Sequence, residues 1–333
     1  MSYFHLNLIL KGKLTVCCLL MLSVIPLNAQ REAKQIGDFK ESISLNEHLR
    51  GTKRTLQYCP DGDEFVCVNG KNRYTRALYG SHSPFRVETS DRPVFAFYNN
   101  GRGGNISFKV ILRDGTELAL DRTGYCESRY SAGKRTYYLT DPSWGKGELR
   151  ISVLALADMD GAIWRFSPSN MPKGAILRWQ HGGATGKRLS RNGDMGVDPA
   201  DCFELPAEAT DLVTGELALQ KEVYLVRGEV PEGYNVRKLY QQAEAASLAL
   251  ASHLKIETPD PYLNTLGGAL VAAADGIWDG QVWLHGAIGW RMPLSGWRAG
   301  YTGDALGWHD RARTHFDAYA ASQVTDVPNT IPH

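Results

Sequence analysis

The chain has 333 residues, with 37 Lys and Arg against 36 Asp and Glu, so its formal net charge at pH 7 is only +1. Because the two signs are balanced and interspersed, the sequence lacks the basic footprint of a nucleic-acid-binding protein. Without a leader of about 30 residues, roughly 300 residues remain, which is enough for two domains.

Residues 1–30 have the pattern of a secretory signal peptide. Two lysines precede a short apolar run, residues 14–22, and small residues follow at 28–30. That order is typical of a cleavable export signal, and the run is too short to span a bilayer. We expect cleavage near Ala29 and a periplasmic or secreted product with no membrane contact after cleavage.

Four cysteines remain after such cleavage: Cys59, Cys67, Cys126 and Cys202. An exported chain can oxidise them, and four cysteines allow three pairings. A hairpin bridge between Cys59 and Cys67 is one alternative, and buried free thiols are the other. No spacing in the chain matches a metal site, and we expect no cofactor.

The next region, residues 31–233, is predicted to be an antiparallel β-sandwich domain. Short apolar or alternating runs are separated by turn signals such as Asp61-Gly62 and Asp114-Gly115. The predicted strands are 64–68, 94–98, 106–110, 148–154, 176–179 and 221–226. Because no helical pattern intervenes, a large antiparallel sandwich is favoured.

The pattern then becomes helical. Residues 236–254 are rich in Ala, Leu, Gln and Glu, contain no Gly or Pro, and follow a capping residue, Asn235. They predict a linker helix within 234–258. A second helix is predicted to begin at Pro261 with Asp260 as its cap. Its expected apolar face consists of Leu263, Leu266, Leu270, Ala273 and Ile277.

A third helix is predicted to follow Thr302 as its cap, with Asp304 at the positive end of the helix dipole. Its expected apolar face consists of Ala305, Trp308, Ala312, Phe316 and Ala320. Residues 278–301 then form a connection between helices that is too long for a simple bundle, and loops of that length are commonly functional.

This connection belongs to a region unusually rich in aromatic residues: five of the eight tryptophans lie between Trp278 and Trp308. Sugars present C–H faces to aromatic rings and hydroxyls to charged groups, so a loop that mixes indoles with Arg, Asp and His suits a carbohydrate pocket. The competing interpretation is a tryptophan-rich core around a helix hairpin, because indoles are also common in cores.

Two motifs carry a resemblance to a known family. The first is FVCVNGKNR at 65–73 with RALYG at 76–80, and the second is GWR at 289–291 with GWRAGYTGD at 296–304. With the order of sandwich, linker helix and helix hairpin, they resemble six-hairpin glycosidases, in which an N-terminal sandwich packs against an (α/α)6 barrel. More narrowly, they are similar to a family of Bacteroidetes proteins associated with polysaccharide-utilisation loci. The resemblance covers nearly the whole mature chain.

The resemblance implies a glycoside hydrolase that acts on glycan oligosaccharides. Arg298, Tyr301 and Asp304 match an aromatic–Arg–Asp cluster that binds the terminal sugar in several relatives. A complete barrel needs far more helices than residues 259–333 predict, so we expect only the N-terminal part of the barrel. The general acid would then be missing, with little or no hydrolysis, and no catalytic residue is assigned. The alternative is a non-catalytic carbohydrate-binding or assembly protein.

The residues predicted to bind sugar come from the aromatic loop and the helix that follows it. Stacking is expected from Trp290, Trp297 and Tyr301, and hydrogen bonds from Arg291, Arg298 and Asp304. Interdomain salt bridges compete for the two arginines, and helix capping competes for Asp304.

Glycoside hydrolysis ordinarily uses two carboxyl groups. The candidates near the loop are Asp275, Asp279, Asp304 and Asp310. A turn role competes for Asp279, and a solvated or interdomain helix face for Asp310. In the sandwich, a basic and aromatic run either lines the interface with the helices or forms a solvated strand face; it consists of Arg73, Arg76, Tyr79, His82 and Arg86.

Overall fold

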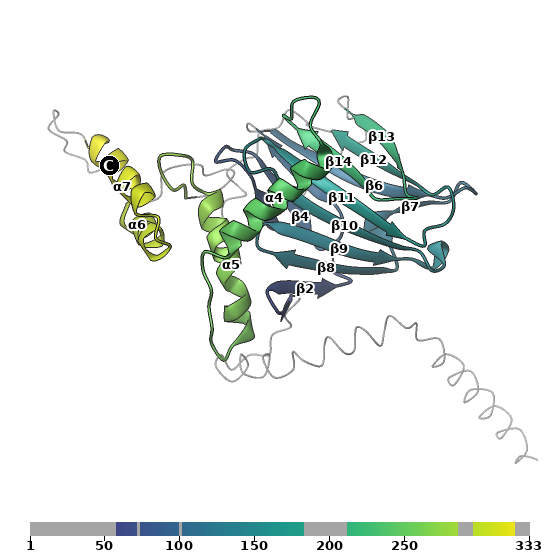
Figure 1. Cartoon of the computed structure of the whole chain (residues 1–333), viewed down its shortest axis with the longest axis horizontal. Coiled ribbons are helices and arrows are strands. Elements are labelled where there is room, and N and C mark those ends of the chain that lie inside the picture. The colour runs from purple at the N-terminus through teal and green to yellow at the C-terminus, as the bar shows by residue number, and fades with distance from the viewer. Residues whose placement is uncertain (1–57, 72–73, 100–101, 183–211, 286–295, 324–333) are drawn as a thin grey trace, which may run out of the picture. The chain divides into compact units, whose positions relative to one another are not determined.

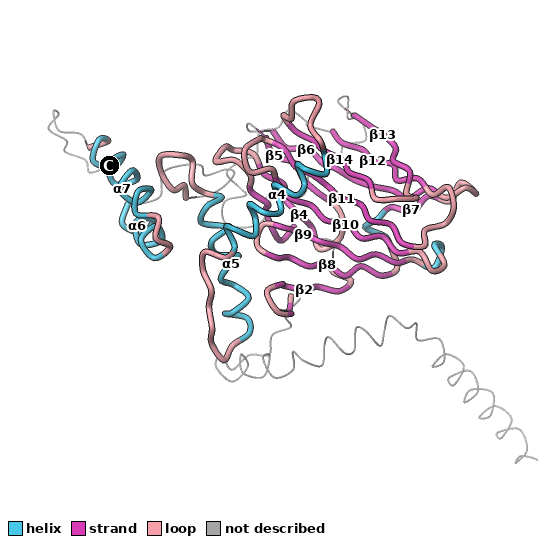
Figure 2. The backbone as a smooth tube through the Cα atoms, viewed as in Figure 1, coloured by secondary structure: helices cyan, strands magenta, loops and turns pink. Residues whose placement is uncertain are grey.

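The computed structural model describes residues 58–71, 74–99, 102–182, 212–285 and 296–323 (Figure 1). The predicted signal peptide and Cys202 therefore lie outside the described residues. Among the described residues, the strands lie between residues 59 and 228 and the α-helices follow from residue 236, as Figure 2 shows by colour. The prediction of an antiparallel sandwich followed by a helical part is confirmed at the level of fold class.

The first sheet is antiparallel throughout, with the strand order β1-β2-β8-β9-β10-β11-β14. Its strands are β1 (Cys59–Asp61), β2 (Glu64–Val68), β8 (Tyr125–Ser131), β9 (Lys134–Thr140), β10 (Glu148–Ala155), β11 (Gly161–Ser169) and β14 (Val223–Gly228).

The second sheet is also antiparallel and has the order β13-β12-β6-β5-β4-β3, with β7 paired to β6. Its strands are β3 (Tyr74–Tyr79), β4 (Arg86–Ser90), β5 (Phe95–Asn99), β6 (Arg102–Ile111), β7 (Glu117–Ala119), β12 (Ile176–Gly182) and β13 (Val213–Ala218). Two short 3-10 helices, η1 (Leu120–Arg122) and η2 (Pro142–Trp144), lie between strands.

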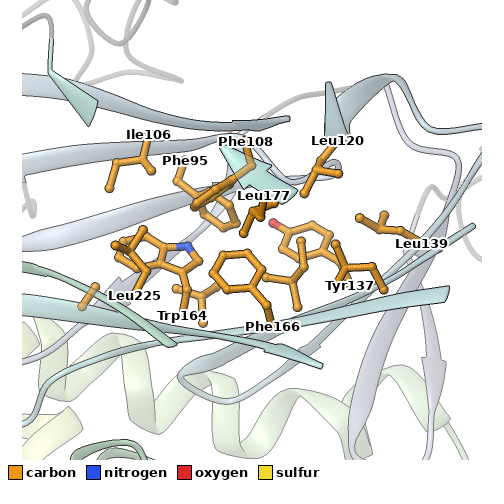
Figure 3. Packing of buried hydrophobic residues seen from close by; sticks show 14 of the residues in the cluster. Phe95, Ile106, Phe108, Leu120, Tyr137, Leu139, Trp164, Phe166, Leu177 and Leu225 are labelled. Atoms are coloured by element: carbon orange, nitrogen blue, oxygen red, sulfur yellow. The ribbon is translucent and has the colours of Figure 1, made fainter. Parts of the chain in front are cut away.

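The two sheets face each other across one aromatic core (Figure 3). Phe95 of the second sheet meets Tyr137 and Trp164 of the first edge to face, with ring centroids 5.7 and 5.6 Å apart. Alternation along each strand sends every second side chain into this layer, which is why the predicted strands pair as a sandwich.

Helix α4 (Val236–Ala251) lies across the outer face of the first sheet (Figure 1). Asn235 caps it by accepting a hydrogen bond from the backbone N–H of Lys238 at 3.0 Å, as predicted. Leu239 and Tyr240 of the helix pack on Leu154 and Ile163 of the sheet. This contact buries one apolar stripe of the helix and fixes it on the sandwich.

Helix α5 (Pro261–Gly276) begins as predicted, since the Asp260 carboxylate accepts a hydrogen bond from the Tyr262 N–H at 2.8 Å. The predicted apolar face is only partly correct. Leu266 and Ile277 pack against hydrophobic clusters, whereas Leu263, Leu270 and Ala273 are exposed. The buried face consists instead of Thr265, Gly267, Val271, Ala272, Ala274 and Gly276.

Helix α5 buries this face because its small residues let the helix backbone approach its neighbours closely. A Cβ on Gly267 would lie 2.8 Å from the carbonyl oxygen of Leu254, and one on Gly276 would lie 2.2 Å from the ring of Tyr79. Only glycine allows such close backbone contact, because the Cβ of any other residue would displace the neighbouring atoms.

The prediction of Thr302 as a helix cap is also wrong. Thr302 lies inside helix α6 (Gly296–Ala305), and a break follows before helix α7 (His309–Ala321). Gly307 in that break has a φ of 70°, a backbone conformation that favours glycine. Of the predicted face on this segment, Ala312 is buried, whereas Ala305, Phe316 and Ala320 are exposed.

Cys59 and Cys126 are free thiols, so no hairpin bridge joins Cys59 to Cys67. Burial raises the pKa of Cys126 to about 12, which keeps this thiol protonated and chemically quiet. Of the two alternatives for these residues, the reduced form is the one observed. Among the described helices, none is both apolar enough and long enough to cross a bilayer.

Candidate functional site

The predicted sugar-binding residues fall into three groups in the structure. Trp290 and Arg291 lie outside the described residues. Trp297 and Arg298 belong to the beginning of α6, although their side chains are not among those described. Tyr301 and Asp304 are described fully and lie three residues apart on the same helix, so they share one face.

Two glycines explain why that face points to solvent. A Cβ on Gly300 would meet the Phe316 ring at 2.3 Å, and one on Gly303 would meet the Trp283 ring at 2.5 Å. The glycine side of α6 therefore packs inward on aromatic rings. Tyr301 and Asp304, each one residue further along, lie on the adjoining side.

That adjoining side carries an aromatic ring beside an exposed polar pair. Tyr301 is 68% exposed. The Asp304 Oδ1 atom lies 2.9 Å from Nδ1 of His309 at the start of α7, and both side chains are about two-thirds exposed. The predicted capping role of Asp304 is not observed, because the residue lies near the end of α6 and not at its beginning. We call Tyr301, Asp304 and His309 the α6 face.

Trp278 and Trp283 do not contribute to such a surface. Trp283 is almost wholly buried, and its ring centroid lies 4.7 Å from that of Trp278. Its indole N–H donates to the carbonyl of Ala274 at 3.1 Å, and its backbone N–H donates to Nδ1 of His315 at 3.1 Å. For these two tryptophans, the interpretation as core residues is the correct one.

The carboxylate of Asp275, at the end of α5, connects the sandwich to the last helix. Its Oδ1 atom lies 2.7 Å from Nη1 of Arg311 and 3.2 Å from Nε2 of His82. Burial acts to raise the pKa of Asp275, but the hydrogen bonds from His82 and Arg311 outweigh it and hold that pKa below its usual value. The Arg311 guanidinium also stacks on Trp308, 4.5 Å from its ring centroid.

A cavity of about 240 Å³ adjoins this cluster, and Tyr79, His82 and Asp275 are among its lining residues. Tyr79 and His82 belong to the basic and aromatic run, so the interface interpretation of that run holds for these two. Arg86 is buried and pairs with Glu88 at 2.8 Å, so it does not lie on a solvated strand face. Arg73 lies outside the described residues.

The remaining carboxylate candidates, Asp279 and Asp310, lie in a turn and in the first turn of a helix. Asp279 holds a turn by accepting from the N–H groups of Gln281 and Val282, as the turn interpretation predicted. Asp310 is exposed in the first turn of α7. Sequence reasoning missed the partnership of His82, Asp275 and Arg311, because these residues are far apart in the chain. The part of the chain that the structure describes holds no cluster of metal-ligating side chains.

Comparison with known proteins adds one match. A family model described as "Domain of unknown function (DUF4450)" matches residues 100–230, which run from β6 to the end of β14. The matched segment lies in the sandwich and ends before the α6 face. A search of curated proteins finds no match.

Proposed function

We propose that this protein is an exported glycoside hydrolase of the sandwich plus (α/α)6 type, and that the described part binds a glycan oligosaccharide at the α6 face. Helices α5, α6 and α7 would belong to the barrel. The observation that carries the proposal is the α6 face itself, where an exposed tyrosine lies beside an exposed carboxylate and imidazole.

The chemistry of this face suits a sugar. The Tyr301 ring offers an apolar surface for the C–H face of a pyranose. Asp304 accepts hydrogen bonds from hydroxyl groups, and His309 adds a ring nitrogen beside it. Trp297 and Arg298 precede Tyr301 on the same helix, and we propose that they extend the site by stacking and by a two-point hydrogen bond. Trp290 and Arg291 complete the proposed set.

We assign Asp275 to positioning and not to proton donation. A general acid in glycoside hydrolysis needs a raised pKa, whereas the pKa of Asp275 is lowered. Its contacts with His82 and Arg311 hold α5 and α7 to the sandwich and thereby support the α6 face. The described site is thus proposed to bind the sugar and not to cleave it.

The binding proposal is tested by calorimetry with a panel of neutral oligosaccharides. Tyr301→Ala removes the stacking surface, and we expect about tenfold weaker binding, or about 1.4 kcal/mol. Asp304→Ala should weaken binding in the same direction. Tyr234→Ala is the matched control, because Tyr234 is another exposed tyrosine at 46%. Equal affinity of all three variants and the original chain would remove the α6 face from the site.

The second candidate function is a non-catalytic carbohydrate-binding protein. The low pKa of Asp275, the most buried carboxylate beside the tryptophan cluster, favours it. Release of reducing ends from an oligosaccharide that the protein binds would rule out the non-catalytic candidate. Little or no release is expected from this chain under either candidate, because the general acid is expected to be missing from it.

A further inference from the structure

The outer face of the first sheet carries two neighbouring arginines that form no ion pair with any carboxylate in the described part of the chain. Arg150 of β10 shares its face with Ser152 and Leu154, and Arg165 of β11 shares its face with Ile163. Helix α4 covers Leu154 and Ile163 on this face. Arg150 and Arg165 lie further along the same two strands and are half-buried.

The strand register places the two arginines side by side. Arg150 is paired with Ser167, and Ser152 is paired with Arg165, so the arginines are diagonal neighbours across β10 and β11. Diagonal neighbours on one face are about 7–8 Å apart at the backbone, within reach of long side chains. The two guanidinium groups therefore place two positive charges on one small area.

Among the described residues, no carboxylate forms a direct ion pair with either arginine; the nearby Glu222 accepts instead from Ser167 and Tyr224. The Nε atom of each arginine is buried without a hydrogen-bond partner, and neither side chain pairs with a carboxylate. By contrast, Arg129 on the same face forms ion pairs with Asp61, Glu64 and Glu127 at 2.6–3.1 Å.

Aromatic rings hold both guanidinium groups in place. Arg150 lies over the Tyr138 ring, 5.3 Å from its centroid, and Arg165 lies over the Tyr240 ring at 4.3 Å. Such stacking orders the planar groups before any ligand arrives, so less side-chain entropy is lost on binding. An oxyanion placed between them would relieve their mutual repulsion and would form charge-assisted hydrogen bonds.

We propose that Arg150 and Arg165 form a binding site for the oxyanion of an acidic saccharide, either the carboxylate of a uronic acid or a sugar sulfate. The oxyanion part of the assignment rests on the two arginines alone. The saccharide part rests on the proposed function. The site lies on the sandwich and is composed of residues other than those of the α6 face.

The test is calorimetric binding by the full chain of four ligands: a uronic acid oligosaccharide, a sulfated oligosaccharide, the neutral parent oligosaccharide and inorganic sulfate. We expect Arg150→Gln and Arg165→Gln each to weaken binding of at least one acidic saccharide about tenfold or more, while leaving the neutral parent unchanged. Arg150→Lys keeps the charge but loses the planar fork, and should give an intermediate loss. Thermal unfolding checks that each variant is folded.

Arg178→Gln is the matched control. Arg178 is an arginine of the other sheet that pairs with Glu117 and Glu216, so its loss should leave anion binding unchanged. Arginine variants that bind like the original chain would overturn the proposal. If acidic saccharides show no advantage but inorganic sulfate binds and its binding depends on both arginines, only the saccharide part is overturned; without such sulfate binding the whole proposal is overturned.

The Tyr301→Ala variant separates this proposal from the α6 face. If Tyr301→Ala leaves neutral sugar binding unchanged while the arginine variants lose acidic sugar binding, the α6 face is wrong and the arginine site stands. The reverse pattern supports the α6 face and overturns the arginine site.

Discussion

The sandwich and the helices that follow it are stabilised in different ways. In the sandwich, two sheets enclose a continuous core in which Phe95, Trp164 and Tyr137 meet edge to face. In helices α5, α6 and α7, the buried rings are fewer. Helix α5 packs on the sandwich core through Tyr262, Leu266 and Ala269, and Asp275 links Arg311 of α7 to His82 of the sandwich. The comparison teaches that a change in the sandwich core lowers the stability of the whole sandwich, whereas a change in the helical part opens that part locally.

The largest expected effect comes from removing a buried indole from each region. Trp164→Ala should lower the free energy of unfolding of the sandwich by about 3–5 kcal/mol, because it leaves a cavity in the central core. Trp283→Ala removes an equally buried ring, but its loss should open α6 and α7 locally. Chemical denaturation measures the first effect, and limited proteolysis after residue 285 measures the second. Proteolysis of both variants at the same rate would contradict the separation of the two regions.

The next effect concerns the carboxylate that joins the two regions. Asp275→Asn removes the charge that Arg311 and His82 contact, and should destabilise the attachment of α7 by about 2 kcal/mol. Because the pKa of Asp275 is lowered in the folded state, its stabilisation is present above the unfolded pKa of about 4 and is lost as the pH falls below it. Proteolysis rates between pH 3 and 6, roughly spanning that value, should rise on acidification in the original chain and stay flat in the variant.

The sandwich should respond to acid in a different window. His181, in β12, accepts a hydrogen bond from Nε of Arg227 at 3.0 Å, and burial together with that charge lowers its pKa to about 4. The unfolded chain binds a proton near pH 6.5, so the stabilisation is full above that pH and is lost as the pH falls toward 4.

The expected loss in this window is about 1–2 kcal/mol, after allowance for partial solvent screening. His181→Gln should flatten the dependence of the free energy of unfolding on pH between about 4 and 6.5. Urea denaturation at several pH values measures this, with His253→Gln as the control for an exposed histidine. An unchanged slope in His181→Gln would show that another group titrates in this range.

The smallest effect is expected at the junction of the two regions. Asn235→Ala removes the cap of α4 and should cost about 1 kcal/mol. Asn235→Asp preserves an acceptor at the cap and serves as the control. Thermal unfolding followed by circular dichroism measures both. A cost as large as that of Asp275→Asn would mean that α4, and not the Asp275 cluster, is the main support of the helical part.

The sequence predicted features that depend on local signals better than features that depend on contacts between distant segments. The strands β2 and β10 and the caps Asn235 and Asp260 were predictable because their signals are local. The buried face of α5 was not, because Leu254 and Tyr79 decide it from other parts of the chain. The break before α7 had a local signal in Gly307, which the apolar periodicity of the region obscured.

The candidate site shows the limit of composition as a guide. Tryptophan content predicted an aromatic sugar site but could not separate Trp278 and Trp283, which are buried, from Tyr301, which is exposed. Spacing of the glycines was the better signal, since Gly300 and Gly303 set which side of α6 faces inward.

The glycines of α5 have a consequence for the order of folding. Each glycine inside a helix costs about 1 kcal/mol relative to alanine, so a peptide of this sequence has little helical structure in isolation. Gly267 and Gly268 both belong to α5, and Gly276 ends it. The segment gains its helical form when it docks on surfaces that the strands have already assembled. Nascent chains should therefore complete the sandwich first and add this helix as a late step.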